Sequence, residues 1–470
     1  MQCPLVFAST GAIARYPMGR KPSFATQLNT FADFSTQSFS VLNNPLSSWA
    51  LNLAMLRDDE AQDWFEFIES VKGQGTLFTF ADPWDNLLTY TEEFENAAWV
   101  KGSSAFIGKN YLLWSEDFSQ AAWTKTNTGG AANPVITTNV SSPLAPDGTQ
   151  TADQIAFPTT TGSQTSVLAQ TITPPSLSSQ VFVFSVFLRA SASVNVQLEI
   201  RDQTGASLGS ANVGLNNTSW QRLAVQCNSG AATSLTVAIY QPASHSASTV
   251  FAVGGQLEYS SGFSTSFSDY TKTTSAATEL LIADPFWLAA PSNFPGSSLG
   301  LNSAFLKRGR QLVIPSTTAP TIDQGIAIAP GGAGNYRNSG LDAVFSLYIK
   351  RQAASPPNCT IQVGDDPGFN ETNAQTFTPT TSWVRCSAAT SFSGSNSGAA
   401  MRARITASAA GTFYIFGAQV DMDLAISRYK HNIATGGVHP NCRIPDLANH
   451  SVDGFDLNTL QEVVIQEYAG

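Results

Sequence analysis

An internal duplication constrains this chain more than any other feature of its sequence. Two segments contain the same four blocks in the same order, and the Trp and Gln of the last two blocks are 36 positions apart in both. Such agreement identifies two copies of one module. The first copy has FSVFLR at 184–189, Asp202, TSWQR at 218–222 and GGQLE at 254–258. The second has FSLYIK at 345–350, Asp365, TSWVR at 381–385 and GAQVD at 417–421.

The sequence around these blocks is typical of β-strands. In VFVFSVFLR and AVFSLYIKR, aromatic and β-branched residues alternate with smaller ones, as a half-buried strand requires. Polar, turn-rich stretches such as LGSANVGLNNTS separate the strands. Only 12% of the residues are charged, which disfavours long, exposed helices. We therefore predict a mainly β protein with two tandem antiparallel β-sandwich modules of jelly-roll type.

A shorter repeat lies upstream of the first copy. LLTYTEEFENAAWVK at 87–101 is similar to YLLWSEDFSQAAWTK at 111–125, and part of it recurs as LLIADPFWLAA at 280–290. We interpret this repeat as the strand and turn that open a module, with 87–110 an incomplete extra copy. This interpretation assigns residues 87–275 to the first module and residues 276–435 to the second.

The two ends of the chain differ from the modules. Trp49, Leu51, Leu53 and Met55 alternate as on one strand face, and the apolar residues of DDEAQDWFEFIESVKGQG then fall on one helical face. We expect residues 1–86 to form an α+β hub domain with one helix. FDLNTLQEVVIQEY at 455–468 is a strand that needs a sheet to join. We expect segment 436–470 to return to the hub, so that both modules are insertions in it.

Composition argues against several functional classes. The net charge is −10 and there is no basic run, so nucleic acid is not expected as a partner. The five cysteines form no CxxC pair, which disfavours a disulfide framework or a metal knuckle, although a bridge between Cys359 and Cys386 stays open. The longest apolar stretch, 181–188, is too short to cross a membrane, and the first residues lack signal-peptide character.

Four tryptophans are candidates for sugar contacts, because an aromatic face packs against the apolar face of a sugar ring. Trp220 and Trp383 occupy equivalent strand positions, which favours packing within the fold. Trp114 and Trp123 are therefore the predicted carbohydrate-binding residues, with a core position as the alternative for each.

Acidic residues suggest two further sites, each with a simpler alternative. Glu92–Glu93 and Glu116–Asp117 are pairs of the kind that glycosidases use, but they lie in the duplicated turn, where a structural role is favoured. Asp365 and Asp366 offer oxygen ligands for calcium, although their spacing is not that of an EF-hand and a polar turn is the alternative. No nucleophile elbow or phosphate-binding loop motif is present. We expect no catalytic residues, no resident metal and no cofactor.

Two stretches resemble known families. WFEFIESVKGQGTLFTFADPWD at 64–85 resembles the distal-tail and minor-tail proteins of long-tailed phages and gene transfer agents, and LNTLQEVVIQE near the end is similar to their terminal strand. YLLWSEDFSQAAWTK with APDGTQTADQI at 145–155 resembles a module of phage virion proteins that is described as carbohydrate-binding or lectin-like. The second copy departs from that pattern, because it lacks the APDG-x-x-TAD block.

The resemblance implies a structural, non-enzymatic virion protein at the tail tip or baseplate, assembled in the host cytoplasm. Such a protein is a homo-oligomer, with a hexameric ring favoured, and it contacts the tail tube and hub proteins. Its peripheral sandwiches face glycans of the host surface. Three alternatives stay open: a receptor-binding tail fibre, a polysaccharide-degrading tailspike and a capsid decoration protein.

Overall fold

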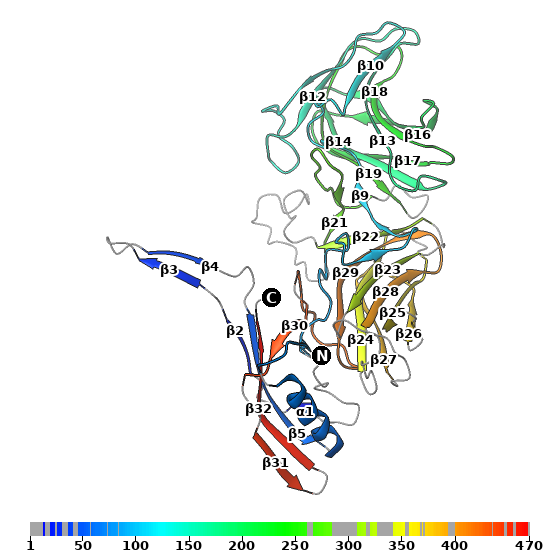
Figure 1. The fold of residues 1–470 in the computed structure, drawn as a ribbon. Helices are drawn as coiled ribbons and strands as arrows, with labels where there is room; N and C mark the ends of the chain where they lie inside the picture. The colour runs from blue at the N-terminus through cyan, green and yellow to red at the C-terminus, as the bar shows by residue number, and fades with distance from the viewer. Residues whose placement is uncertain are drawn as a thin grey trace.

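The computed structural model describes most of the chain, and Figure 1 shows its course. Within the described residues the protein is mainly β, with one helix, so the predicted fold class is confirmed. The described residues are 13–14, 19–23, 26–30, 36–40, 46–56, 58–72, 74–82, 84–260, 267–283, 308–315, 320–326, 342–352, 357–366, 369, 372–392, 400–434, 436–445, 449–454 and 457–468.

The hub domain is a sheet with one helix packed on it. Its long strands β5 (Leu46–Leu56) and β32 (Leu457–Glu467) pair antiparallel, with Ile465 opposite Trp49, so the last strand of the chain lies in the sheet of the first domain. The other strands of this sheet are β1 (Ile13–Ala14), β2 (Gly19–Ser23), β6 (Phe78–Ala81), β30 (Val438–Arg443) and β31 (Asn449–Gly454).

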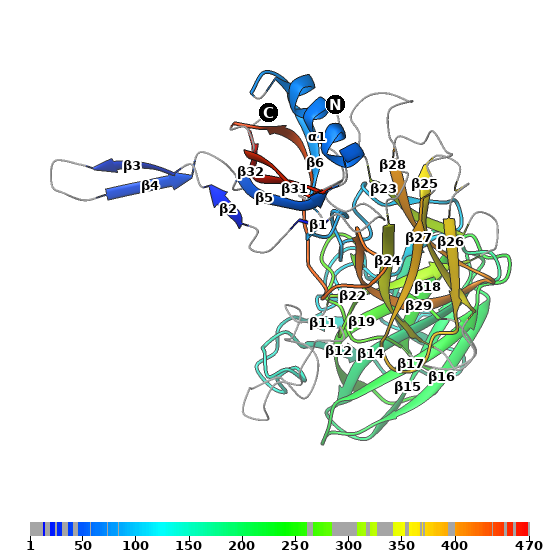
Figure 2. The ribbon, with the colours of Figure 1, turned by 90° about the horizontal axis from the view of Figure 1, so that it is seen from below.

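Helix α1 (Asp58–Val71) buries one face against this sheet. Ala61, Trp64, Ile68 and Val71 are buried as the periodicity predicts. Phe65 is only half-buried. A separate hairpin of β3 (Thr26–Thr30) and β4 (Thr36–Ser40) extends away from the hub sheet in both views (Figures 1 and 2).

The first sandwich consists of two five-stranded antiparallel sheets packed face to face around one core. One sheet has, in order, β10 (Thr124–Thr128), β13 (Thr165–Ile172), β18 (Leu235–Gln241), β15 (Val194–Arg201) and β16 (Ser207–Leu215). The other has β11 (Val135–Thr137), β12 (Asp153–Phe157), β19 (Ser248–Tyr259), β14 (Val181–Ala190) and β17 (Gln221–Asn228).

The second sandwich repeats this plan. One sheet has β21 (Leu281–Ile282), β22 (Gly309–Ile314), β29 (Gly411–Asp421), β24 (Asp342–Arg351) and β27 (Val384–Ser391), with β8 (Phe106–Ile107) beside β22. The other has β26 (Thr372–Phe377), β25 (Cys359–Asp366), β28 (Ala400–Ala407), β23 (Thr321–Ile326) and β7 (Val100–Lys101).

The duplication is visible in backbone detail. The ladder between β14 and β19 is interrupted after Ser185, and the ladder between β24 and β29 is interrupted after Ser346. Gly254 and Gly417, the first residues of the two G-x-Q blocks, have positive φ angles of 69° and 64° beside these irregularities. Only glycine adopts such a conformation without strain, which explains the glycine in both copies.

The first sandwich is inserted in the second. Leu88, Phe94 and Trp99 lie in the core of the second sandwich, and the short strands β7 and β8 pair with β23 and β22. Our assignment of 87–110 to the first module is therefore wrong: residues 87–107 are the opening element of the second. Where the chain leaves and returns, β9 (Lys109–Asn110) pairs with β20 (Thr278–Glu279). The repeat identified two opening elements, but their packing partners lie far along the chain.

We predict that the two tryptophans of the opening elements stabilise different sandwiches. Trp99→Ala removes a side chain that is 1% exposed from the core of the second sandwich, and should destabilise that sandwich by about 3–5 kcal/mol. Hydrogen exchange on the full-length chain should show lost protection in β24 and β29 and retained protection in β14 and β19. Trp123→Ala should give the reverse pattern, and a loss confined to β14 and β19 in Trp99→Ala would contradict the insertion.

Candidate functional site

Trp123 has a structural role. It is 1% exposed, and its indole Nε1 donates a hydrogen bond to the carbonyl of Trp114 at 3.1 Å. Trp99 makes the same bond to the carbonyl of Tyr90 at 2.9 Å in the second sandwich. A buried ring offers no face to a sugar, so the structure places Trp123 in the core instead of a binding surface.

Trp114 is only partly buried and packs against the same core. Its φ of 52°, like the 48° of Tyr90, lies in the left-handed region that bulky residues rarely adopt. The bond from Trp123 holds this turn in place. A sugar contact at Trp114 stays a prediction, and Trp114 is not among the residues that line the cleft described below.

The first carboxylate of each acidic pair is engaged in contacts within the fold. Glu92 accepts a hydrogen bond from the hydroxyl of Tyr429 at 2.9 Å and lies 3.0 Å from the Arg308 guanidinium. At the equivalent place Glu116 contacts Tyr270 and Lys272. In both sandwiches these bonds tie the opening turn to the segment that follows the last long strand. A structural role, the alternative stated above, therefore accounts for Glu92 and Glu116.

The calcium prediction gains no support. Asp365 is 1% exposed within β25, while the side chain of Asp366 lies outside the described residues. In the described part of the chain, no group of three or more acidic, histidine or cysteine side chains is arranged to hold a metal ion. Cys359 and Cys386 are both buried free thiols, so the open bridge between them is not formed.

The APDGTQTADQI block orders one strand of the first sandwich. Asp153, at the start of β12, is fully buried and accepts backbone hydrogen bonds from Phe118 at 2.7 Å and Asn139 at 2.9 Å. Burial raises the pKa of Asp153 to about 6, against the opposing effect of these two bonds. The block thereby fixes β12 to the opening element, and the other end of β12 lines a cleft.

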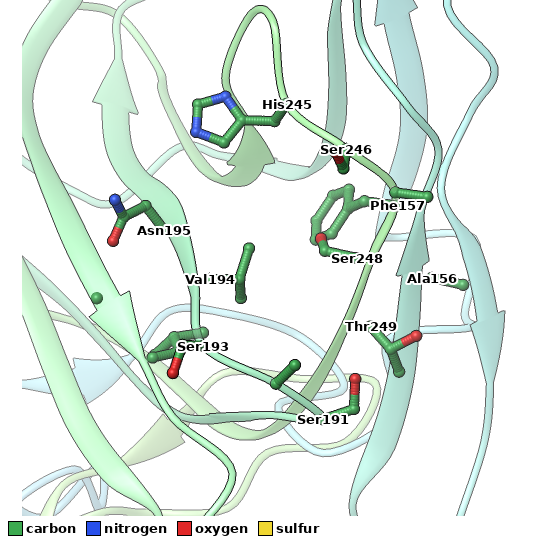
Figure 3. Close-up of a pocket in the computed structure, with 14 residues that line it drawn as sticks. Ala156, Phe157, Ser191, Ser193, Val194, Asn195, His245, Ser246, Ser248 and Thr249 are labelled. Atoms are coloured by element: carbon green, nitrogen blue, oxygen red, sulfur yellow. The ribbon is translucent and has the colours of Figure 1, made fainter.

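This cleft, about 820 Å³ in volume, lies between the two sheets at one end of the first sandwich (Figure 3). The ends of β12 and β19 line one side, the ends of β15 and β16 line the other, and residues 191–193 and 245–247 complete it. Phe157 and Leu215 are buried at its base, while Ala156 and Val194 are partly exposed in the lining and supply a small apolar surface. The volume is in the range of small-molecule sites, which combine apolar surface with a few polar groups.

The cleft is rich in polar side chains that make no side-chain hydrogen bond within the described part of the chain. Among the described residues, none of five lining side chains makes a hydrogen bond of its own; these are Ser191, Ser193, Asn195, Ser246 and Thr249. Ser248 is different, because its hydroxyl donates to Gln241. The five free hydroxyl and amide groups can donate and accept hydrogen bonds to a ligand.

His245 lies at the edge of the cleft on a well-held loop. Its backbone NH donates to Thr160 Oγ1 at 3.0 Å, and its carbonyl accepts from the Thr160 NH at 2.9 Å. Gln241 Nε2 also donates to the Ser246 carbonyl at 2.8 Å. The ring Nδ1 contacts the Ala243 carbonyl at 2.8 Å, and Figure 3 shows the ring facing Asn195 across the cleft. These bonds hold the loop before any ligand arrives.

The described residues of the second sandwich differ at the corresponding place. Loop 242–247 corresponds to the shorter loop 408–410, because Ser248 and Gly411 each lie eight residues before the Gln of the G-x-Q block. Pro357 packs on Gly411 so tightly that an added Cβ would lie 2.6 Å from its Cδ. The Ser408 NH donates to the Asn358 carbonyl at 2.9 Å. None of the cleft residues was singled out from the sequence, although aligning the two copies would have revealed the three-residue difference.

The outer face of the same sandwich offers less room. Tyr240 is 8% exposed and packs with Val167, Ala169 and Ala238 in a small cluster on this face. The Arg201 guanidinium lies 5.3 Å from the Tyr240 ring centroid. This face is filled by its own side chains, so the cleft is the stronger candidate site.

No family model matches this chain, and no curated protein matches it. Solved structures match with low identity. The tandem CBM22-1-CBM22-2 domain of Paenibacillus barcinonensis Xyn10C is 12% identical and covers 69% of this chain and 99% of that one, with a TM-score of 0.24. The enzymatically active domain of bacteriophage CBA120 tailspike protein 4 is 17% identical over 32% of this chain and 21% of that one, also with a TM-score of 0.24.

A family 11 carbohydrate-binding module of Clostridium thermocellum, solved with a β-1,3-1,4-mixed-linked tetrasaccharide, is 10% identical. It covers 33% of this chain and 96% of that one, with a TM-score of 0.24. At such identities and scores, the function has to be argued from the cleft itself. No helix in the described residues is long and apolar enough to cross a bilayer.

We predict that Asp153 makes the stability of the fold depend on pH. A carboxyl whose pKa is raised on folding stabilises the fold fully below its unfolded pKa, and this contribution is lost as pH rises through its folded pKa, about 6 here. Between about pH 4 and about pH 7, the stability of the wild type relative to Asp153→Asn should fall by about 2 kcal/mol. Calorimetric melting of both full-length proteins across this range measures the difference. A difference that is independent of pH would contradict the raised pKa.

Proposed function

We propose that this chain is a non-catalytic structural protein of a tailed phage whose first sandwich binds a glycan of the host surface. The cleft in Figure 3 is the observation that carries the glycan-binding part. Sugars present hydroxyl groups around the rim of a ring and C–H groups on its faces. The cleft offers matching groups, because hydroxyl and amide side chains lie beside the partly exposed apolar side chains of Ala156 and Val194.

The architecture supports different roles for the two sandwiches. The second sandwich connects to the hub, and Pro357 packs against Gly411 at the place that corresponds to the cleft. The first sandwich is inserted in it and lies on the side of the second sandwich away from the hub in Figure 1. We assign scaffolding to the second sandwich and binding to the first.

The proposal of a tail-tip location rests on the hub. The two stretches that resemble distal-tail proteins, at 64–85 and near the end of the chain, belong to one sheet-and-helix domain through the pairing of β32 with β5. We propose that this domain assembles a homo-oligomeric ring, hexameric by the resemblance, and contacts other tail proteins. Several copies of one weak glycan site in such a ring would bind a cell surface with high avidity.

We predict that glycan affinity depends on the polar side chains of the cleft. Asn195→Ala and His245→Ala should each weaken binding about fivefold, because each removes one hydrogen-bonding group, which contributes about 1 kcal/mol. Titration of the full-length protein with a glycan selected from an array of bacterial surface glycans measures the change. Asn358→Ala, at the position of the second sandwich that corresponds to Asn195, is the matched control and should leave affinity unchanged. Equal affinities in all four proteins would exclude the cleft as the site.

Assembly is tested separately from binding. Negative-stain electron microscopy of the purified full-length protein should show closed rings with peripheral lobes. Elongated trimers would instead support a receptor-binding fibre. Release of reducing ends from host polysaccharide would contradict the non-catalytic part of the proposal.

A further inference from the structure

We infer that the cleft selects uncharged sugars and rejects glycans that carry a carboxylate, sulfate or phosphate at the bound residue. This inference rests on the proposed glycan-binding function and defines its ligand class. It follows from the composition of the lining.

The lining has no fixed charge. None of its fourteen residues is Asp, Glu, Lys or Arg, and His245 is the only one with a titratable side chain. The remaining polar groups are hydroxyls and one amide, which bind sugar hydroxyls well but do not neutralise an anion. An anionic group that loses water in such a cleft finds no opposite charge to compensate it.

The charged residues nearest in sequence do not supply that compensation. Arg189 lies two positions before Ser191, but its Nη2 donates to the carbonyl of Asn217 at 2.6 Å, outside the lining. The ion pair of Glu199 and Arg201 lies further along β15, on the outer face. The net charge of the chain, −10, adds a long-range repulsion against acidic polymers.

The test uses an array of paired glycans that share a core and differ by one sialic acid, one hexuronate or one phosphate. The full-length protein is compared with Ala247→Trp, which places a bulky ring at the exposed rim of the cleft. The matched control is Ala409→Trp, which adds the same ring to the corresponding exposed loop of the second sandwich. Both positions are exposed loop residues, and thermal melting verifies that each variant folds.

We expect the neutral member of a recognised pair to bind about tenfold or more tightly than its acidic partner. Binding should be lost in Ala247→Trp and kept in Ala409→Trp. Affinity for the neutral member should change less than about twofold between about 0.05 M and about 0.5 M NaCl, since no ion pair forms.

The outcomes separate the inference from the function on which it rests. If the acidic members bind more tightly and Ala247→Trp abolishes that binding, the cleft binds glycans but does not select uncharged sugars. Binding that Ala247→Trp leaves intact would overturn both the inference and the proposed site. Absence of binding to any member of the array would overturn glycan binding altogether.

Discussion

The packing of an opening element across each sandwich core determines how this chain is organised. In each copy a buried asparagine, Asn86 or Asn110, donates its side-chain NH₂ to two carbonyls of distant segments, and a buried tryptophan follows thirteen residues later. Because the partners of Asn86 come from residues 418 and 430, the second sandwich closes only when the chain returns from the first. The insertion of one copy in the other is a direct consequence.

This nesting explains why two copies of one fold have different surfaces. The buried framework is common to both, since Trp99 and Trp123, Gly254 and Gly417, and Glu92 and Glu116 have equivalent roles. The loops at one end of each sandwich are outside this framework and are free to differ. In the first copy they line an open polar cleft, whereas in the second Pro357 packs against Gly411.

The sequence predicted the fold class, the duplication and the single helix, because each depends on a local period or a repeated spacing. It did not predict where residues 87–107 pack, since strands as short as β7 and β8 take their positions from partners more than 200 residues away. For the site, aromatic residues were a poor guide: Trp123 is a core residue. The cleft residues are small and polar, and nothing in their local sequence distinguishes them from ordinary turn residues.

We propose that a glycan binds between the two sheets of the first sandwich. A structure of the full-length protein with a bound oligosaccharide tests it most directly. We expect a sugar ring between Asn195 and His245, and no sugar at the corresponding place of the second sandwich. A sugar on the outer face over Tyr240, or one bound to the second sandwich alone, would contradict it.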